Sequence, residues 1–437
     1  MAGSGKTAVT LGLLRVFQRR GLKVQMFKCG ADGVDSRFHS FVCPESGTVH
    51  LDTFLASRTH VQQVYNRYGA EADVCMIDGM TGLADGYNRL SGSTAEVAQA
   101  LGLPAVLVVN ARGMAYSVAP MLYGFKAFRS LPRIAGVLFN QVSSPAHYAC
   151  LQEACASAGL PCLGYVPPVA VQLPQRYGPL LSGEPVVKEV ADSMAAAIEA
   201  HVDVNKLLAL CNLPFPCSYT LPYTSTDTWR SPLSKKWKIA VCMDSAYLFF
   251  LRENMDRLKE LGMVSQFSLL HSHQFPEADL VYLPGGYPEL FVRMLHRRSG
   301  MLQQLHDYIE AGGRVLAEDG GLAILGRSLK LRDNKAYAMA GVLPLDFETI
   351  SRDARVNAGY RMVRHGDTLL KGYEMHYTQC AQQGIASATQ VFNAKGMPLP
   401  TLFIRYKNLV ASFIRWYWGD TDLRMLWDFP LQEGGKQ

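Results

Sequence analysis

The sequence predicts an α/β protein of two domains, and three observations carry this prediction. Strand-like and helix-like segments alternate through the first 200 residues, a Ser/Thr/Pro-rich stretch follows, and the alternation then resumes. A length of 437 residues allows each half to bury its own core. We therefore expect domains at 1–208 and 237–437, joined by a linker over 209–236.

The first domain has the pattern of a parallel sheet covered by helices. Apolar runs rich in Val, Ile and Leu alternate with segments of helical periodicity. Ligands of such sheets bind beyond the carboxyl ends of the strands. We expect strands at 22–28, 73–77, 103–109, 134–139 and 162–166, and helices at 8–20, 94–101, 114–129, 146–158 and 187–200.

The chain begins within a phosphate-binding pattern. Gly5-Lys6-Thr7 is the second half of G-x-x-x-x-G-K-[ST], whose opening glycine would fall one residue before Met1. In such a loop the backbone N–H groups and the lysine bind phosphate, and the hydroxyl binds Mg²⁺. A helical pattern follows directly, which argues against a chance Gly-rich terminus. We expect the strand that feeds this loop, the first of the domain, to be missing from the sequence as given.

Carboxylates follow two of the expected strands. Asp78 ends an apolar strand, where a nucleotide-bound Mg²⁺ needs a hard oxygen ligand. Asp32 and Asp35 lie in a Gly-rich turn after another strand, where they could supply a further metal ligand and a substrate contact. Each Asp alone is more often a turn former or a helix cap. Three of them in one P-loop domain favour the functional interpretation.

Composition excludes several classes of protein. The net charge of +6 is spread without a long basic run, so nucleic acid is not expected as a partner. No apolar run approaches the ~18 residues of a membrane span, and no signal peptide is visible. Ten cysteines without C-x-x-C spacing indicate reduced thiols. We expect a cytoplasmic protein without membrane contact.

The second domain repeats the α/β pattern with different turns. Two strands end in Gly-rich turns, Pro284-Gly285-Gly286 and Asp319-Gly320-Gly321. We expect strands at 237–243, 279–283 and 314–317 and helices at 251–261 and 301–311.

Taken in order, the motifs resemble the cobyrinate a,c-diamide synthase family of tetrapyrrole amidases. The residues that carry the resemblance are the P-loop Gly3–Thr7, 28–35 (family K-x-G-P-D-Y-I-D), 78–86 (E-G-x-M-G-L-F-D-G), 92–96, 111–115, 252–254, 285–290 and 372–377. They span nearly the whole chain. The resemblance implies a P-loop, dethiobiotin-synthetase-like domain followed by a class I glutamine amidotransferase-like domain.

The resemblance also implies a reaction and its residues. ATP phosphorylates a carboxylate of the macrocycle, and ammonia then displaces phosphate to give an amide. ATP and Mg²⁺ are the expected cofactors, a tetrapyrrole is the expected substrate, and a homodimer is the expected assembly. The resemblance implies that Asn140 contacts the adenine of ATP, but its position after a strand is equally consistent with an ordinary turn residue. The implied catalytic residues are Lys6, Asp35 and Asp85; the nucleotide-binding residues are Gly3, Ser4, Gly5, Lys6, Thr7 and Asn140; the metal ligands are Thr7, Asp32 and Asp78.

The glutaminase positions depart from the family pattern. The family's A-E-C-G-G turn reads Ala317-Glu318-Asp319-Gly320-Gly321 here, so the thiol nucleophile is absent. The family also has a late strand with the motif S-Y-x-H-x-H-F, which carries the histidine that activates the thiol. The matching segment here, 412–418, contains no histidine, and Arg415 stands at the position of that base. A carboxylate is a poor nucleophile toward an amide. We expect an Asp319–Arg415 ion pair, no glutaminase activity, and ammonia supplied free or by another protein, with glutamine kept as a possible nitrogen source. His376 is expected to be structural.

The substrate and the activity leave alternatives open. Ala31-Asp32-Gly33 replaces the family's Pro-Asp-Tyr, and Asp78 replaces its Glu, so the macrocycle could be cobyrinate or sirohydrochlorin or its metallated relative. A non-catalytic paralogue that binds nucleotide or tetrapyrrole is a second hypothesis. A P-loop ligase of an unrelated carboxylate is a third, against which the retained second domain speaks.

Overall fold

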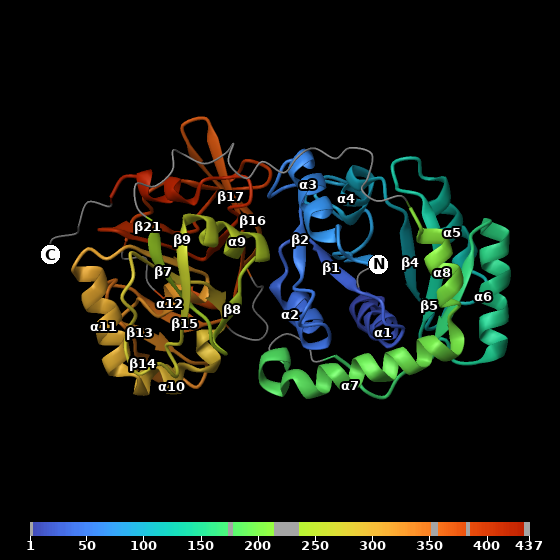
Figure 1. The fold of residues 1–437 in the computed structure, drawn as a ribbon, viewed down its shortest axis with the longest axis horizontal. Helices are drawn as coiled ribbons and strands as arrows, with labels where there is room; N and C mark the ends of the chain where they lie inside the picture. The colour runs from blue at the N-terminus through green and yellow to red at the C-terminus, as the bar shows by residue number, and fades with distance from the viewer. Residues whose placement is uncertain (1–2, 174–177, 214–235, 351–356, 382–384, 432–437) are drawn as a thin grey trace. The chain divides into compact units, whose positions relative to one another are not determined.

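A computed structural model describes residues 3–173, 178–213, 236–350, 357–381 and 385–431. The chain divides into two compact units, Met1–Thr224 (unit 1) and Ser225–Gln437 (unit 2), drawn in Figure 1. Most of the linker expected at 209–236 lies outside the described residues. Within those ranges, no helix is long and apolar enough to cross a membrane.

Unit 1 is built from parallel strands and helices, as the sequence predicts. Its elements are α1 (Lys6–Arg19), β1 (Val24–Cys29), α2 (Gly33–Val42), β2 (Val49–Leu51), α3 (Arg58–Gly69), β3 (Val74–Asp78), α4 (Thr94–Leu101), β4 (Ala105–Asn110), α5 (Val118–Ala127), β5 (Ile134–Asn140), α6 (Pro145–Ala158), β6 (Cys162–Val166), α7 (Gly178–His201) and α8 (Val204–Cys211). All five predicted strands are confirmed. Because α8 runs to Cys211, the start of the expected linker is helical.

The strands of unit 1 form two parallel three-stranded sheets in the described part of the chain, ordered β2-β1-β3 and β4-β5-β6. In the first sheet, Lys28 on β1 is paired in register with Asp78 on β3. Adjacent parallel strands therefore carry a cation and a carboxylate to the same level, near the carboxyl ends of both strands. This register positions the candidate site.

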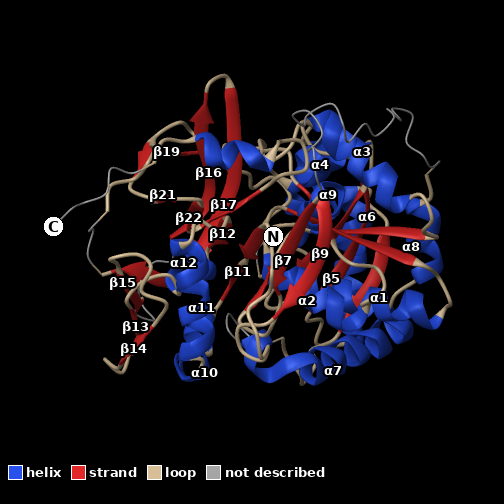
Figure 2. Cartoon of the chain, turned by 60° about the vertical axis from the view of Figure 1, so that its left-hand side comes forward, coloured by secondary structure: helices blue, strands red, loops and turns tan. Residues whose placement is uncertain are grey.

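Helices α1 and α7 pack along each other in unit 1 (Figures 1 and 2). Gly12 permits the close approach, because a Cβ at that position would lie 2.7 Å from the Cβ of Met194. Around this contact, Leu11, Leu14 and Ile198 are fully buried. The helices thus hold the P-loop, which precedes α1, against a rigid support.

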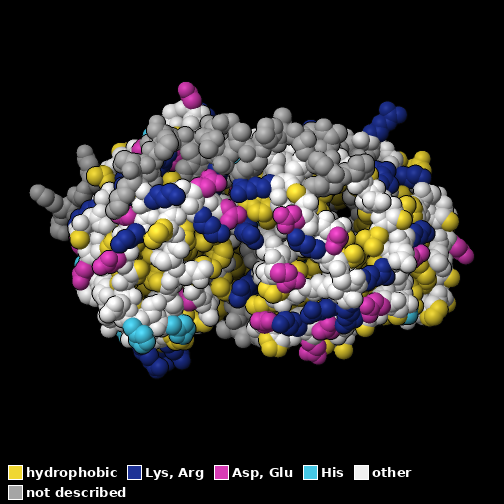
Figure 3. Space-filling model, viewed as in Figure 1, with side chains coloured by type: hydrophobic (Ala, Val, Ile, Leu, Met, Phe, Trp, Pro, Cys, Tyr) yellow, Lys and Arg dark blue, Asp and Glu magenta, His cyan; other side chains and the backbone are white. Residues whose placement is uncertain are grey.

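Polar residues cover the outer side of the same helices. Asp192 on α7 forms ion pairs with Arg15 and Arg19, and Arg19 also pairs with Glu199. Along the lower edge where Figure 1 draws α7, Figure 3 shows acidic and basic side chains mixed. This mixture of signs is typical of a solvated protein surface.

Unit 2 starts as an α/β unit and continues into further strands, most of whose pairings are antiparallel. Its elements are β7 (Trp237–Cys242), β8 (Tyr247–Phe249), α9 (Arg252–Leu261), β9 (Gly262–Phe267), β10 (Leu280–Leu283), β11 (Gly285–Gly286), η1 (Pro288–Leu290), α10 (Val292–Arg297), α11 (Ser299–Glu310), β12 (Val315–Glu318), α12 (Gly320–Ala323), β13 (Ser328–Lys330), β14 (Ala336–Ala338), β15 (Asp346–Thr349), β16 (Asn357–His365), β17 (Thr368–His376), β18 (Thr378–Cys380), β19 (Val391–Asn393), β20 (Pro398–Leu399), β21 (Phe403–Tyr406), β22 (Leu409–Ser412), β23 (Ile414–Trp416) and η2 (Leu423–Asp428). The three predicted strands and two predicted helices are confirmed.

The main sheet of unit 2 has the order β21-β22-β12-β10-β7-β9, parallel except for the β21–β22 pair. The single late strand expected at 412–418 is wrong. Ser412 ends β22 in this sheet, whereas β23 pairs with β17 in another sheet. The chain changes sheets at Phe413, and this change places Arg415 beside the turn that follows β12.

Candidate active site

The phosphate-binding loop has the backbone that its glycines predict. Gly3 and Gly5 have φ angles of 70° and 83°, in the left-handed region that favours glycine. Gly5 is also the N-cap of α1, so Lys6 and Thr7 open a 14-residue helix. Backbone N–H groups at this helix start are oriented to bind an anion.

Asn140 lies at the end of β5 and supports the loop. Its Nδ2 donates to the carbonyl oxygen of Ser4 at 3.0 Å, and its Oδ1 accepts from the backbone N–H of Gln141 at 3.0 Å. A Cβ on Gly5 would lie 2.2 Å from Nδ2, so glycine is required at that position. The structure therefore places Asn140 under the P-loop as a positioning residue, and its expected adenine contact stays a prediction.

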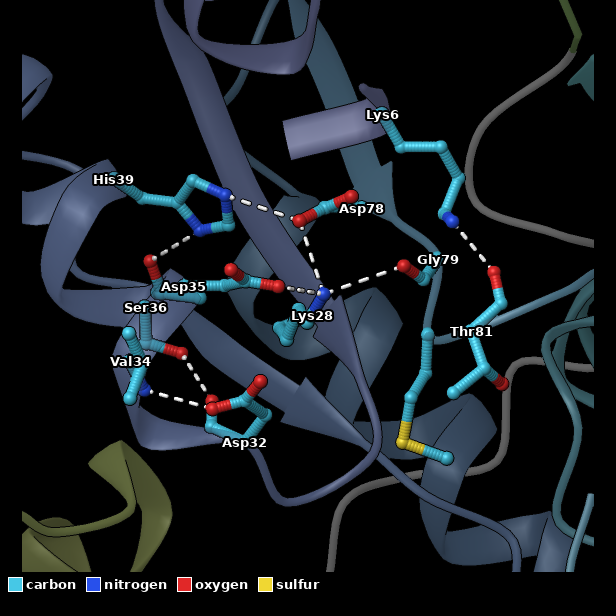
Figure 4. Close-up of polar contacts among 12 residues, drawn as sticks. Lys6, Lys28, Asp32, Val34, Asp35, Ser36, His39, Asp78, Gly79 and Thr81 are labelled. Carbon is cyan, nitrogen blue, oxygen red and sulfur yellow. Dashed lines mark hydrogen bonds and ion pairs between the residues drawn. The ribbon is translucent and has the colours of Figure 1, made fainter. Parts of the chain in front are cut away.

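Lys6 contacts the loop that follows β3. Its Nζ donates to the carbonyl oxygen of Thr81 at 2.5 Å (Figure 4). Burial lowers the pKa of Lys6, against the attraction of Asp78 and other carboxylates. Thr81 has a φ of 40°, which is rare for a residue other than glycine and is typical of functional sites.

Lys28 is the centre of a buried charge cluster that Figure 4 shows beside Lys6. Its Nζ donates to Oδ2 of Asp35 at 2.6 Å, to Oδ2 of Asp78 at 3.0 Å and to the carbonyl oxygen of Gly79 at 3.2 Å. Burial alone would lower the pKa of Lys28, but the two carboxylates raise it. The sequence motif contains Lys28, yet no role was expected for it.

Asp78 keeps one oxygen available within this cluster. Burial opposes its ionisation, but Lys28 and His39 stabilise the charge and lower the pKa of Asp78 to about 2. Both of these partners approach Oδ2, His39 at 3.4 Å. Oδ1 is buried and has no hydrogen-bond partner in the described part of the chain. A permanently charged carboxylate with an orphaned oxygen is a suitable ligand for a hard cation.

The remaining expected carboxylates have local structural partners. The turn expected around Asp32 and Asp35 is instead the start of α2, with Asp32 as its N-cap: Oδ1 accepts from the backbone N–H of Val34 at 2.8 Å. Oδ2 of Asp85 accepts from the backbone N–H of Gly82 at 3.1 Å. Asp35 and Asp85 nevertheless both act electrostatically on Lys6. The structure thus gathers Lys6, Asp35, Asp78 and Asp85, and assigns Asp32 a capping role.

A cavity of 380 Å³ opens at the carboxyl ends of β4, β5 and β6. Its position beyond parallel strands is where ligands of α/β sheets bind. Gln141, next to Asn140 in sequence, contributes to the wall. The cavity is lined by Arg112, Gly113, Gln141, Ser143, His147 and Pro168.

In unit 2, Asp319 occupies a sharp turn between β12 and α12. Its φ of 50° and ψ of −115° are strained for a residue other than glycine, and its side chain is buried. Oδ2 lies 3.8 Å from Nε of Arg415, so the expected ion pair is present, beyond hydrogen-bond distance. Burial raises the pKa of Asp319 to about 7, although Arg415 lowers it.

His376 lies in a hydrogen-bond network with Glu374 and Thr378. Its Nε2 is 2.7 Å from Oε1 of Glu374, and its Nδ1 contacts the carbonyl oxygen of Thr378. Its ring stacks on Phe413 with 3.8 Å between centroids. These contacts agree with a structural role for His376.

Comparison with known proteins shows to which family the chain belongs. It is 33% identical to a cobyrinate a,c-diamide synthase of Syntrophotalea carbinolica over 94% of this chain and 93% of the relative. It is 34% identical to that of Salmonella typhimurium over 86% and 84%, and 32% identical to a hydrogenobyrinate a,c-diamide synthase of Rhodobacter capsulatus over 91% and 92%. The chain belongs to the cobyrinate a,c-diamide synthase family.

Two family models match separate segments of this member of the cobyrinate a,c-diamide synthase family. Residues 1–178 match a CobQ/CobB/MinD/ParA nucleotide-binding domain, and residues 238–412 match a CobB/CobQ-like glutamine amidotransferase domain. A crystal structure of a glutamine amidotransferase gives a TM-score of 0.30 at 15% identity, covering 40% of this chain and 88% of that one, which supports no functional argument. The family match confirms the predicted fold class.

Within this family member, the nucleotide-binding unit holds an intact charge cluster and the amidotransferase unit holds an altered one. Lys6, Lys28 and Asp78 converge in unit 1. At the turn of unit 2, Asp319 and Arg415 supply neither a thiol nor an imidazole. The two units therefore differ at these sites: a lysine–carboxylate cluster in the first, and a buried carboxylate–guanidinium pair in the second.

Proposed function

We propose that the chain is an ATP-dependent carbon–nitrogen ligase that amidates the a and c acetate carboxylates of cobyrinate with ammonia, in cobalamin biosynthesis. The relatives' names supply the substrate. The observation that carries the ligase chemistry is that Lys6, at a helix start, lies within electrostatic reach of Asp78, whose buried Oδ1 has no hydrogen-bond partner among the described residues.

Phosphoryl transfer is the first step. The N–H groups of the P-loop and Lys6 would bind the γ-phosphoryl group, and a substrate carboxylate oxygen would attack phosphorus as ADP leaves. Asp78 and the hydroxyl of Thr7 would hold magnesium, which supplies positive charge to the phosphates when bound. The orphaned Oδ1 of Asp78 fits this role. Asp32 is proposed only as a more distant contributor, because it caps α2.

Amide formation is the second step. Ammonia would attack the acyl carbon, phosphate would leave with the bonding electrons, and the extra proton would pass to a nearby base. Asp35 and Asp85 are the proposed residues on the substrate side, because both lie near Lys6. The base and ribose of ATP are proposed to occupy the cavity lined by Arg112 and Gln141.

A turnover assay tests this proposal. The full chain is incubated with Mg-ATP and either cobyrinate or sirohydrochlorin, with ammonium chloride in one series and glutamine in another. We expect ADP and a two-fold amidated cobyrinate with ammonium. Amidation of sirohydrochlorin alone would correct the substrate, and no product in any arm would refute the ligase. The homodimer stays a prediction that light scattering would test.

A further inference from the structure

Three buried polar groups around the altered turn of unit 2 have no hydrogen-bond partner among the described residues. They are Oε1 of Glu289, both carboxylate oxygens of Asp319 and the hydroxyl of Tyr247. The exposed fractions of these residues are 7%, 1% and 0%. Buried polar groups are nearly always satisfied, so three orphans in one place indicate a bound species.

All three groups adjoin one short strand, β11. Gly286 is paired in register with Tyr247, and a Cβ on Gly285 would lie 2.9 Å from Oδ2 of Asp319. Glu289 follows in the η1 turn, and its charge acts on Tyr247, while the charge of Asp319 acts on Glu289. The orphaned oxygens therefore belong to one neighbourhood.

The charges of this neighbourhood favour a cation. Burial raises the pKa of Glu289 and of Glu318 to about 8, and once these carboxyls are ionised the negative groups outnumber the fixed positive ones. The exposed Arg332, which also faces Glu289, is screened by solvent. The oxygens of Glu289 and Asp319 accept hydrogen bonds when they are ionised, so a donor would satisfy them. Nε of Arg415, itself a donor, also has no hydrogen-bond partner at this turn. The buried carboxylates are Glu289, Glu318, Asp319 and Glu374, and the buried groups that can carry positive charge are Arg361, Arg415 and His376.

We propose that the turn of unit 2 binds one ammonium ion through Glu289, Asp319 and the hydroxyl of Tyr247. Ammonium has four N–H donors, and its hydrogen bonds of about 2.8 Å suit acceptors that are more widely spaced than metal ligands at about 2.0–2.6 Å. No group of three or more His, Cys, Asp or Glu in the described ranges has the geometry of a metal site. The choice of ammonium over potassium rests on the proposed function, in which ammonia is the nitrogen donor.

Thermal unfolding of the full chain tests ion binding without any ligation. The midpoint of unfolding is followed in an amine-free buffer against ammonium chloride, potassium chloride and tetramethylammonium chloride at constant ionic strength. A ligand that binds only the folded state raises this midpoint in a saturable way. We expect saturation with ammonium alone. Tetramethylammonium has no N–H donor and serves as the matched cation.

Single substitutions test whether ammonium binds at the turn of unit 2. Glu289→Gln and the milder Tyr247→Phe should weaken ammonium binding at least tenfold, whereas Glu277→Gln, at a side chain that is 94% exposed, should leave it unchanged. In the ligation assay, Glu289→Gln should raise the KM for ammonium while the KM for ATP stays constant. The KM readout separates nitrogen delivery from a loss of stability, which would lower kcat for every substrate.

The outcomes distinguish this inference from the proposed function. Saturable ammonium binding without ligation would refute the ligase and keep the ion site. Ligation with ammonium, but no ammonium-specific shift, would overturn the ion site and leave buried water as the partner of these groups. An equal effect of potassium would overturn the assignment to ammonium.

Discussion

The ammonium group of Lys28 lies 3.0 Å from Oδ2 of Asp78, and both side chains are buried. The two residues are paired in register on β1 and β3, so the sheet itself fixes their distance. Because Lys28 occupies Oδ2 and leaves Oδ1 without a partner, it orients the carboxylate toward the phosphate side of the site. Lys28 is therefore a positioning residue for Asp78.

Replacing Lys28 by methionine should destabilise unit 1. The change keeps most of the side-chain volume but leaves the buried carboxylate of Asp78 and the partly buried one of Asp35 without their cation. Removing one partner of a buried ion pair costs about 3–5 kcal/mol. Urea unfolding of the full chain would measure the change.

The control for this substitution is Lys23→Met. The side chain of Lys23 is 64% exposed and pairs with Glu71 at the surface, so its loss should cost less than about 1 kcal/mol. Equal effects of the two substitutions would contradict the central role of Lys28.

Replacing Lys6 by alanine should abolish ligation and leave the fold intact. Lys6 contacts the carbonyl oxygen of Thr81, so no buried carboxylate depends on it alone. The loss of a charged phosphate contact in the transition state should cost about 3 kcal/mol or more, over a hundredfold in kcat. Initial rates of ADP release with cobyrinate and ammonium would show this, with circular dichroism as the check on folding. Near-normal turnover would rule out phosphoryl transfer at this loop.

The sequence could predict the phosphate loop and the carboxylate at the end of β3, because both depend on local motifs. It could not predict that Lys28 joins them. That contact depends on the register between β1 and β3, whose residues are 50 positions apart. The sequence left a helix cap open for Asp32, and the structure shows that cap at the start of α2, while its role as a metal ligand stays a prediction.

The altered turn of unit 2 was predictable only in part. The replacement of the family's cysteine and histidine is visible in the sequence, and the Asp319–Arg415 pair follows from it. The orphaned groups of Glu289 and Tyr247 were not predictable, because neither residue type nor spacing says which buried atoms lack partners. Most strands after residue 326 were also missed: apart from the nine-residue strands of the β16–β17 hairpin, each has two to four residues.

Unit 2 should lose stability as the pH rises from about 5 to about 8. Burial raises the pKa of Glu289 and of Glu318 to about 8 each. The folded state therefore holds protons that the unfolded state releases above its ordinary carboxyl pKa. Stability from this source is fully present below pH 4 and is lost as the pH passes the folded values, at up to about 1.4 kcal/mol per pH unit for each group.

Unfolding midpoints in ammonium-free buffers across this range would measure the slope. Glu289→Gln should flatten it, because glutamine stays neutral at every pH, and the facing charges of Asp319 and Arg332 are retained. Glu277→Gln, at the surface, is the matched control. A slope of the same size in Glu289→Gln would show that other groups cause the pH dependence.

Wild-type protein should release no glutamate from glutamine, with or without ATP, and two substitutions should restore some release. Asp319 stands where the family has its cysteine, and its backbone is strained, with φ 50° and ψ −115°. Nε of Arg415 already lies 3.8 Å from the carboxylate of Asp319, and an imidazole at position 415 would place a nitrogen at a similar reach from the backbone. The double variant Asp319→Cys/Arg415→His would therefore pair a thiol with a base.

A coupled glutamate assay tests this expectation, with Asp319→Ala/Arg415→His as the control that has the base but no nucleophile. We expect glutamate from the cysteine double variant only, and much less from Asp319→Cys alone, because an unpaired buried thiol stays protonated. Iodoacetamide should then inactivate glutamate release in the double variant while ligation with ammonium continues. Glutamate release by the wild-type chain would mean that another residue acts as the nucleophile, and the orphaned carboxylates around Gly285 would then need a different explanation.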